Sequence, residues 1–210
     1  NVAGINSASY SSDWPLASGL WPLLLSGTNY ISIRAFDNVG NTTELPDAFY
    51  VKKDTQAPQI TDNQAGDSVW RNANTGVYNV DFADPGGSLL SKFQVKASTG
   101  PNQTGALALD WTDNITNINS ASYITDWALA AGNWTLLLSG TNYISVRTFD
   151  SAGNSSAAID AFFVLKDTIA PNAIANLSAA TGLEGELNIS WTAPSDDGTG
   201  AGKVSSYVVK

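Results

Sequence analysis

The sequence Ile5-Asn-Ser-Ala-Ser-Tyr10 returns unchanged as Ile118-Asn-Ser-Ala-Ser-Tyr123, and this repetition decides the architecture. The register continues without a gap: residues 1–58 align with residues 114–171 at an offset of 113, and 37 of the 58 positions are identical. A repeat of about 110 residues has the length of one β-sandwich domain. The chain is therefore predicted to contain tandem copies of one module.

The two copies and the sequence beyond them divide the chain into three predicted domains. Residues 1–54 match only the C-terminal part of a module, and residues 55–168 make a complete one. Residues 172–210 follow a different pattern, which predicts the N-terminal part of a third module. Both ends are expected to cut through domains, as in a segment of a longer polypeptide. The linkers share the pattern Asp-Thr-x-Ala-Pro, whose proline restricts the backbone.

Short alternating stretches predict an all-β fold of tandem antiparallel β-sandwiches. Residues 77–82 and 92–96 alternate apolar with polar side chains, which is the period of a half-buried strand. Further strands are expected at 106–111, 134–138, 142–150 and 161–166. Turns are expected at Asp84-Pro-Gly-Gly87 and at Gly100-Pro-Asn102. Helical periodicity is missing, so 127–131 is expected to form at most one short turn.

The composition excludes several functional classes. The chain has no cysteine and no histidine, so it lacks thiolate ligands and the commonest general base near neutral pH. We therefore expect it not to be an enzyme. With 10 Lys and Arg against 19 Asp and Glu, the net charge of −9 argues against binding to nucleic acid. No apolar run approaches the ~20 residues that cross a bilayer, so no membrane span is expected.

Two sets of motifs carry a resemblance to known families. Trp134-Thr-Leu-Leu-Leu-Ser-Gly140, Phe149-Asp-Ser-Ala-Gly-Asn154 and Asp167-Thr-Ile-Ala-Pro171 together resemble bacterial immunoglobulin-like repeats. Ile189-Ser-Trp191 and Pro194-Ser-Asp-Asp-Gly198 resemble a bacterial fibronectin type III domain. Such modules occur in large surface and adhesin proteins. The resemblance implies an extracellular or cell-surface location and a spacer or binding role without chemistry.

Two functions fit this resemblance. The first is a non-catalytic structural or adhesive segment, such as a stalk, filament or surface-layer repeat, of a much longer secreted protein. Its expected partners are the neighbouring modules, other copies in a filament or surface layer, and surface glycans. The alternative is a polysaccharide-binding or spacer accessory region of a secreted carbohydrate-active enzyme. Binding to immobilised glycans distinguishes the two.

Aspartates near the linkers form candidate calcium sites. In a sandwich of this topology, the incoming linker, one loop and the last hairpin lie at the same end of the module. The side chains expected to meet at the first linker are Asp54, Asp84, Asp150 and Asn154. Those expected to meet at the second are Asp167, Asp196 and Asp197. Calcium takes six to eight oxygen ligands in flexible geometry, although Asp and Asn are also ordinary turn residues.

One strand carries a candidate contact surface for another protein or a glycan. In 142–150, Ile144 and Val146 share one face, so the opposite face presents an aromatic and arginine stripe. The stripe consists of Tyr143, Arg147 and Phe149, and the first copy repeats it as Tyr30, Arg34 and Phe36. The favoured alternative is that residues 97–117 cover this face, because large apolar patches are rarely exposed.

The tryptophans are predicted mainly to pack. Trp21 and Trp134 precede a leucine run and are predicted to anchor cores. Trp14 and Trp127 follow an aspartate in a predicted turn. They are expected in the core or at its rim, with an exposed platform for stacking sugars as the alternative. A rim position would make Trp127→Ala less costly than Trp134→Ala.

Overall fold

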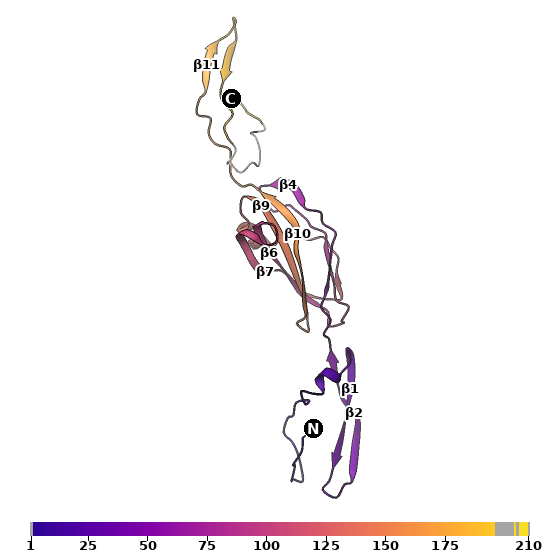
Figure 1. The fold of residues 1–210 in the computed structure, drawn as a ribbon. Helices are drawn as coiled ribbons and strands as arrows, with labels where there is room; N and C mark the ends of the chain where they lie inside the picture. The colour runs from indigo at the N-terminus through magenta and orange to yellow at the C-terminus, as the bar shows by residue number, and fades with distance from the viewer. Residues whose placement is uncertain (1, 196–203, 205, 210) are drawn as a thin grey trace.

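The computed structural model describes residues 2–195, 204 and 206–209, and it confirms the predicted all-β class. In these residues, twelve strands accompany one α-helix and one 3-10 helix. The strands form four sheets that occupy three successive stretches of the chain. Figure 1 shows these stretches following one another along an extended molecule.

The first and last stretches each contain a single two-stranded antiparallel sheet. The N-terminal stretch has the 3-10 helix η1 (Trp21–Leu23) and the strands β1 (Gly27–Phe36) and β2 (Thr42–Lys53). The C-terminal stretch has β11 (Ser178–Thr181) and β12 (Leu187–Ser190). A single hairpin buries little apolar surface, so many large side chains of these stretches stay exposed.

The middle stretch contains two sheets. The five-stranded sheet has the order β4-β10-β9-β6-β7, in which β4 and β10 are parallel and the other neighbours are antiparallel. The three-stranded sheet has the antiparallel order β3-β5-β8. The strands are β3 (Gln59–Asp62), β4 (Asp67–Arg71), β5 (Val80–Ala83), β6 (Leu90–Gly100), β7 (Thr104–Ser120), β8 (Ser122–Tyr123), β9 (Gly140–Asp150) and β10 (Ser155–Lys166).

Apolar side chains of both sheets meet in one core. Phe82 of β5 stacks on Phe93 of β6, with ring centroids 4.5 Å apart. In β9, Ile144 and Val146 are fully buried, as the alternating pattern predicts. The expected strands at 92–96, 106–111, 142–150 and 161–166 are confirmed within β6, β7, β9 and β10.

The strand expected at 134–138 is wrong, because residues 134–136 form the last part of helix α1 (Ala131–Leu136) and Leu137 is its C-terminal cap. Trp134 and Leu137 are buried, whereas Leu136 and Leu138 are exposed, so the burial period is three residues rather than two. The Lys166 ammonium donates to the carbonyls of Trp134 and Leu137, at 3.0 and 2.7 Å. These bonds add donors for carbonyls at the C-terminal end of the helix, where the Trp134 carbonyl also accepts the Leu137 amide at 3.2 Å.

Tryptophan burial differs from the expected pattern. Trp127 is only 3% exposed and its indole Nε1 donates to the Val80 carbonyl, so it lies in the core, which is one of the two packed positions predicted for it. Trp134 is 7% exposed and lies in the core as predicted. Trp14 and Trp21 are 37% and 45% exposed. Only the β1–β2 sheet is available to cover them within the described part of the N-terminal stretch.

Tyr78 makes core stability pH-dependent in the alkaline range. Burial first, and then the Asp67 charge, raise the pKa of Tyr78 from 10.0 to about 12, with the Arg71 charge opposing them. Between these values the unfolded chain loses the phenol proton while the folded chain keeps it. The stabilising contribution is therefore complete below pH 10 and is lost as pH rises towards 12.

We expect Tyr78→Phe to flatten the decline of unfolding free energy between pH 10 and 12. The measurement is urea unfolding of wild type and variant at a series of pH values. Lysines that titrate in the same range affect both proteins, so the difference between the two slopes reports Tyr78 alone. Identical slopes would contradict the assignment.

Candidate functional site

Three aspartates meet where the first linker reaches the middle stretch. Asp54 directly follows β2, Asp84 directly follows β5, and Asp150 is the last residue of β9. Each offers a carboxylate oxygen, and these oxygens lie within 4.8 Å of one another. The prediction that these three carboxylates lie close together is therefore confirmed.

Backbone amides of the local turns orient each carboxylate. In every case, the Oδ1 atom accepts a hydrogen bond from an amide two or four residues further along the chain, which is usual turn chemistry for aspartate. The bonds join Gln56 to Asp54 (2.9 Å), Gly86 to Asp84 (2.8 Å) and Asn154 to Asp150 (2.8 Å). The three carboxylates are thus held in place by their own loops.

Further contacts fasten the linker to the middle stretch. The Ser88 amide donates to Asp54 Oδ2 at 3.2 Å, and a Cβ atom at Gly86 would overlap the Asp54 carboxylate. The Asn154 Nδ2 donates to the Asp54 carbonyl (3.3 Å) and to Asp150 Oδ2 (2.8 Å). Asn154, predicted as a ligand, therefore braces two of the aspartates. The roles of Gly86 and Ser88 were missed, because only the folded loop brings them to Asp54.

The cluster concentrates negative charge. Asp84 and Asp150 are 6% and 3% exposed, and none of the three carboxylates pairs with Lys or Arg in the part of the chain that the structure describes. Burial raises the pKa of Asp54, but hydrogen bonds from Ser88 and Gln56 outweigh it and lower that pKa. At about 5 Å and an effective dielectric constant of about 20, two such charges repel by about 3 kcal/mol.

The donor set fits a calcium ion. Calcium–oxygen bonds of about 2.3–2.6 Å keep any two ligand atoms within about 5 Å of each other. The three carboxylate oxygens lie within 4.8 Å of one another and meet this limit. Asp54, Asp84 and Asp150 would hold the ion, and its charge would offset their repulsion.

The repeat provides two comparisons. Asp37, the equivalent of Asp150, is exposed and accepts the same bonds from Asn41, but among the described residues it belongs to no cluster of three carboxylates. Asp167, the equivalent of Asp54, accepts the Ile169 amide at 2.9 Å. Its predicted partners, Asp196 and Asp197, lie outside the described residues.

The stripe of β9 is partly exposed, and the segment predicted to cover it does so only in part. Most of residues 97–117 belong to β6 and β7 and extend the same sheet, but the turn between these strands reaches β10, where the Asn102 amide donates to Asp160 Oδ2. One residue of this segment, Trp111, still contacts the stripe, since its ring centroid is 4.6 Å from the Arg147 guanidinium. In the first copy, Tyr30 and Phe36 are 67% and 69% exposed, and Arg34 pairs with Glu44.

The comparisons with known proteins leave the family open. No protein-family model matches the chain, and no curated protein matches it either. Among the helices that the structure describes, none has the length and apolar character needed to span a membrane.

Proposed function

We propose that the chain is a non-catalytic structural or adhesive segment of an extracellular protein. Its modules would be immunoglobulin-like in residues 1–54 and 55–168 and fibronectin type III-like from residue 172. In this role the chain spaces or displays other parts of the protein at a cell surface. Calcium bound by Asp54, Asp84 and Asp150 would set the angle between the first two modules.

The strand order of the middle stretch supports the immunoglobulin-like assignment. In chain order from β3 to β10, the first, third and sixth strands form one sheet. In the other sheet the seventh strand, β9, lies between the fourth, β6, and the eighth, β10. Immunoglobulin sandwiches place strands A, B and E in one sheet and strands C, F and G in the other. The C-terminal hairpin β11–β12 is too small to support a specific domain type.

The observation that carries the calcium proposal is the meeting of three carboxylates from a linker, a loop and a hairpin. One of them belongs to the segment that joins two stretches, so a bound cation ties that segment to the middle stretch. Without a cation, repulsion among the carboxylates favours their separation. Binding that requires the assembled site then stabilises the assembled linker.

We expect Asp84→Asn to weaken calcium binding by at least tenfold, because it removes one of three ligand charges. Isothermal titration of the 210-residue chain with calcium chloride measures the affinity. Small-angle scattering with calcium and then with chelator measures the shape. Wild type should change from an extended, narrow particle to a broader ensemble when the chelator is added.

Asp81→Asn is the matched control, since Asp81 lies on β5 three residues before Asp84 and outside the cluster. This variant should bind calcium as wild type does. Superimposable scattering curves with and without calcium, or equal losses of affinity in the two variants, would reject the proposed role. The aspartates would then be ordinary turn residues.

A further inference from the structure

Six identical residues have different structures in the two copies of the repeat. Residues 118–123 of the middle stretch contribute to β7 and β8, whereas the identical residues 5–10, all of them described, form no strand. In the middle stretch, β7 pairs with β6 and β8 pairs with β5. Both partner strands belong to residues 55–113, which we call the front half-module. Because the six residues are identical, their strand pairing depends on this front half-module.

The back half-module, residues 114–167 and their equivalents 1–54, keeps its internal contacts in the first copy. Trp14 lies edge-to-face against Phe49, with ring centroids 6.3 Å apart at 64°, and the equivalent pair is 5.8 Å apart at the same angle. The Lys53 ammonium donates to the Leu24 carbonyl at 2.8 Å, and the equivalent bond is 2.7 Å long. The back half-module therefore has the same local packing in both copies.

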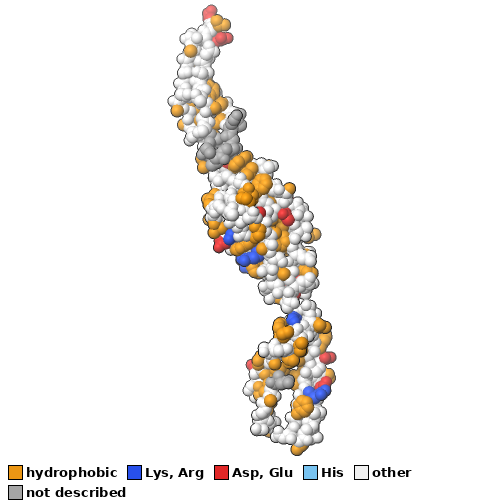
Figure 2. Space-filling model, viewed as in Figure 1, with side chains coloured by type: hydrophobic (Ala, Val, Ile, Leu, Met, Phe, Trp, Pro, Cys, Tyr) orange, Lys and Arg blue, Asp and Glu red, His pale blue; other side chains and the backbone are white. Residues whose placement is uncertain are grey.

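The inner face of the back half-module is open in the first copy. Trp14, Ile33 and Phe49 are 37%, 36% and 38% exposed, whereas their equivalents in the middle stretch are at most 3% exposed. Figure 2 shows hydrophobic side chains at the surface of the N-terminal stretch. Apolar surface of this kind is rarely left uncovered. The middle stretch shows which kind of segment covers it.

The front half-module supplies the cover in the middle stretch. Tyr78, just before β5, stacks on Phe162 with ring centroids 4.3 Å apart. Phe93 of β6 lies 4.8 Å from Trp127, between ring centroids, and the Val80 carbonyl accepts the Trp127 indole Nε1 at 3.0 Å. The first copy keeps both of the aromatic side chains that receive these contacts.

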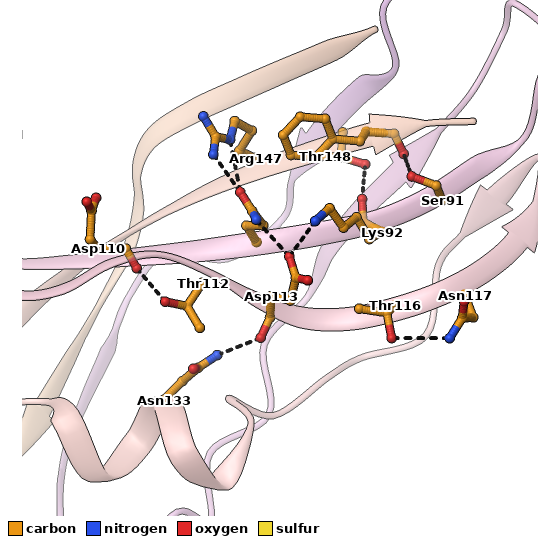
Figure 3. Close-up of polar contacts among 12 residues, drawn as sticks. Ser91, Lys92, Asp110, Thr112, Asp113, Thr116, Asn117, Asn133, Arg147 and Thr148 are labelled. Atoms are coloured by element: carbon orange, nitrogen blue, oxygen red, sulfur yellow. Dashed lines mark hydrogen bonds and ion pairs between the residues drawn. The ribbon is translucent and has the colours of Figure 1, made fainter. Parts of the chain in front are cut away.

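The front half-module also occupies a strand edge. In the middle stretch, β6 pairs antiparallel with β9, and the Thr148 hydroxyl donates across this pairing to the Lys92 carbonyl at 3.3 Å, as Figure 3 shows. The equivalent of β9 is β1, which pairs with β2 alone among the described residues. Its other edge therefore offers backbone amides and carbonyls to a further strand.

One polar contact of the front half-module has its acceptor ready in the first copy. The Asp160 carboxylate accepts the Asn102 amide, which belongs to the turn between β6 and β7. Asp47, the equivalent of Asp160, has the same left-handed backbone, with a φ of 47° against 51°. Its amide donates to Ser32 Oγ at 3.1 Å, and the equivalent bond is 3.0 Å long. The Asp47 side chain is exposed and is thus available to an incoming turn.

We propose that the inner face and open edge of the β1–β2 sheet bind a front half-module, a polypeptide segment with the strand pattern of residues 55–113. The β6-like strand of this partner pairs antiparallel with β1, and its equivalent of Phe93 covers Trp14. Residues 5–10 then form the strands that their identical copy forms. Arg34 takes no part, because it pairs with Glu44. This binding depends on the repeat and not on calcium at the linker.

The test joins a second copy of residues 55–113 directly ahead of Asn1, because residue 1 aligns with residue 114. Hydrogen exchange followed by mass spectrometry, in chelator, compares this extended chain with the 210-residue chain. Exchange in residues 5–10 and in β1 should slow by at least about tenfold in the extended chain, since their amides enter strand pairs. Exchange in residues 114–168 should stay unchanged.

Phe93→Asp in the added copy alone is the disruptive variant, because it places a charge against Trp14, and exchange should return to that of the 210-residue chain. Lys96→Gln in the added copy is the matched control on the other face of the same strand, and it should keep the protection. Equally fast exchange in the extended and 210-residue chains would overturn the proposal, as would protection that survives Phe93→Asp. So would protection of β1 that grows with the concentration of the 210-residue chain, because the face would then belong to a second copy.

Discussion

Trp127→Ala is expected to lower the unfolding free energy of the middle stretch by about 3–5 kcal/mol, the usual cost of emptying a large buried aromatic site. The Trp127 indole lies 4.8 Å from the Phe93 ring and 5.8 Å from the Phe162 ring, between centroids. Both rings belong to the five-stranded sheet, and the bond from the Trp127 Nε1 to the Val80 carbonyl joins the indole to β5 of the three-stranded sheet. The substitution also leaves the Val80 carbonyl without its indole donor, which adds the cost of an unsatisfied buried acceptor.

The measurement is urea unfolding of the 210-residue chain, with hydrogen exchange of β9 amides to follow the middle stretch separately. Trp111→Ala is the matched control, because Trp111 lies on the outer face of the sheet and should cost clearly less. Trp134→Ala, at the edge of the core, should cost no more than Trp127→Ala. A cost for Trp127→Ala equal to that of Trp111→Ala would contradict its central position.

The regular strands could be predicted because one face of each is buried. Ile144 and Val146 alternate with polar or amphipathic neighbours, and burial selects the register. The helix α1 could not be predicted this way, because a leucine run fits both a strand and a helix. One contact that the local pattern does not reveal is made by Lys166, 29 residues beyond Leu137, whose ammonium donates to carbonyls at the end of the helix.

The candidate metal site was predictable for a different reason. Asp54, Asp84 and Asp150 each stand immediately after or at the end of a strand, so topology alone brings them to one end of the module. The contact between Trp111 and Arg147 was not predictable. The β6–β7 pairing shifts register between Phe93 and Gln94, and again after Val95. Each shift changes which β7 side chains face outward. The alternation of apolar and polar residues in the sequence does not reveal where such shifts occur.

The second large effect is expected for Lys166→Met, which should lower the unfolding free energy by about 2–4 kcal/mol. Lys166 is 6% exposed, and its ammonium also donates to the Thr135 carbonyl at 3.3 Å. Methionine fills a similar space without a donor, so the loss reports hydrogen bonding to buried carbonyls more than packing. Lys53 makes the equivalent bonds in the first copy, to Trp21, Pro22 and Leu24.

Lys92→Met provides the control, since Lys92 forms an exposed ion pair with Asp113 whose loss should cost at most about 1 kcal/mol. Urea unfolding gives the two costs, and hydrogen exchange of the α1 amides gives a local readout. Exchange there should accelerate in Lys166→Met and stay unchanged in Lys92→Met, because Lys166 donates to carbonyls at the end of the helix and Lys92 does not. If both variants lose the same stability and leave α1 equally protected, the ammonium is not what holds this segment helical. The leucine run would then have to owe its conformation to the burial of Trp134 and Leu137 alone.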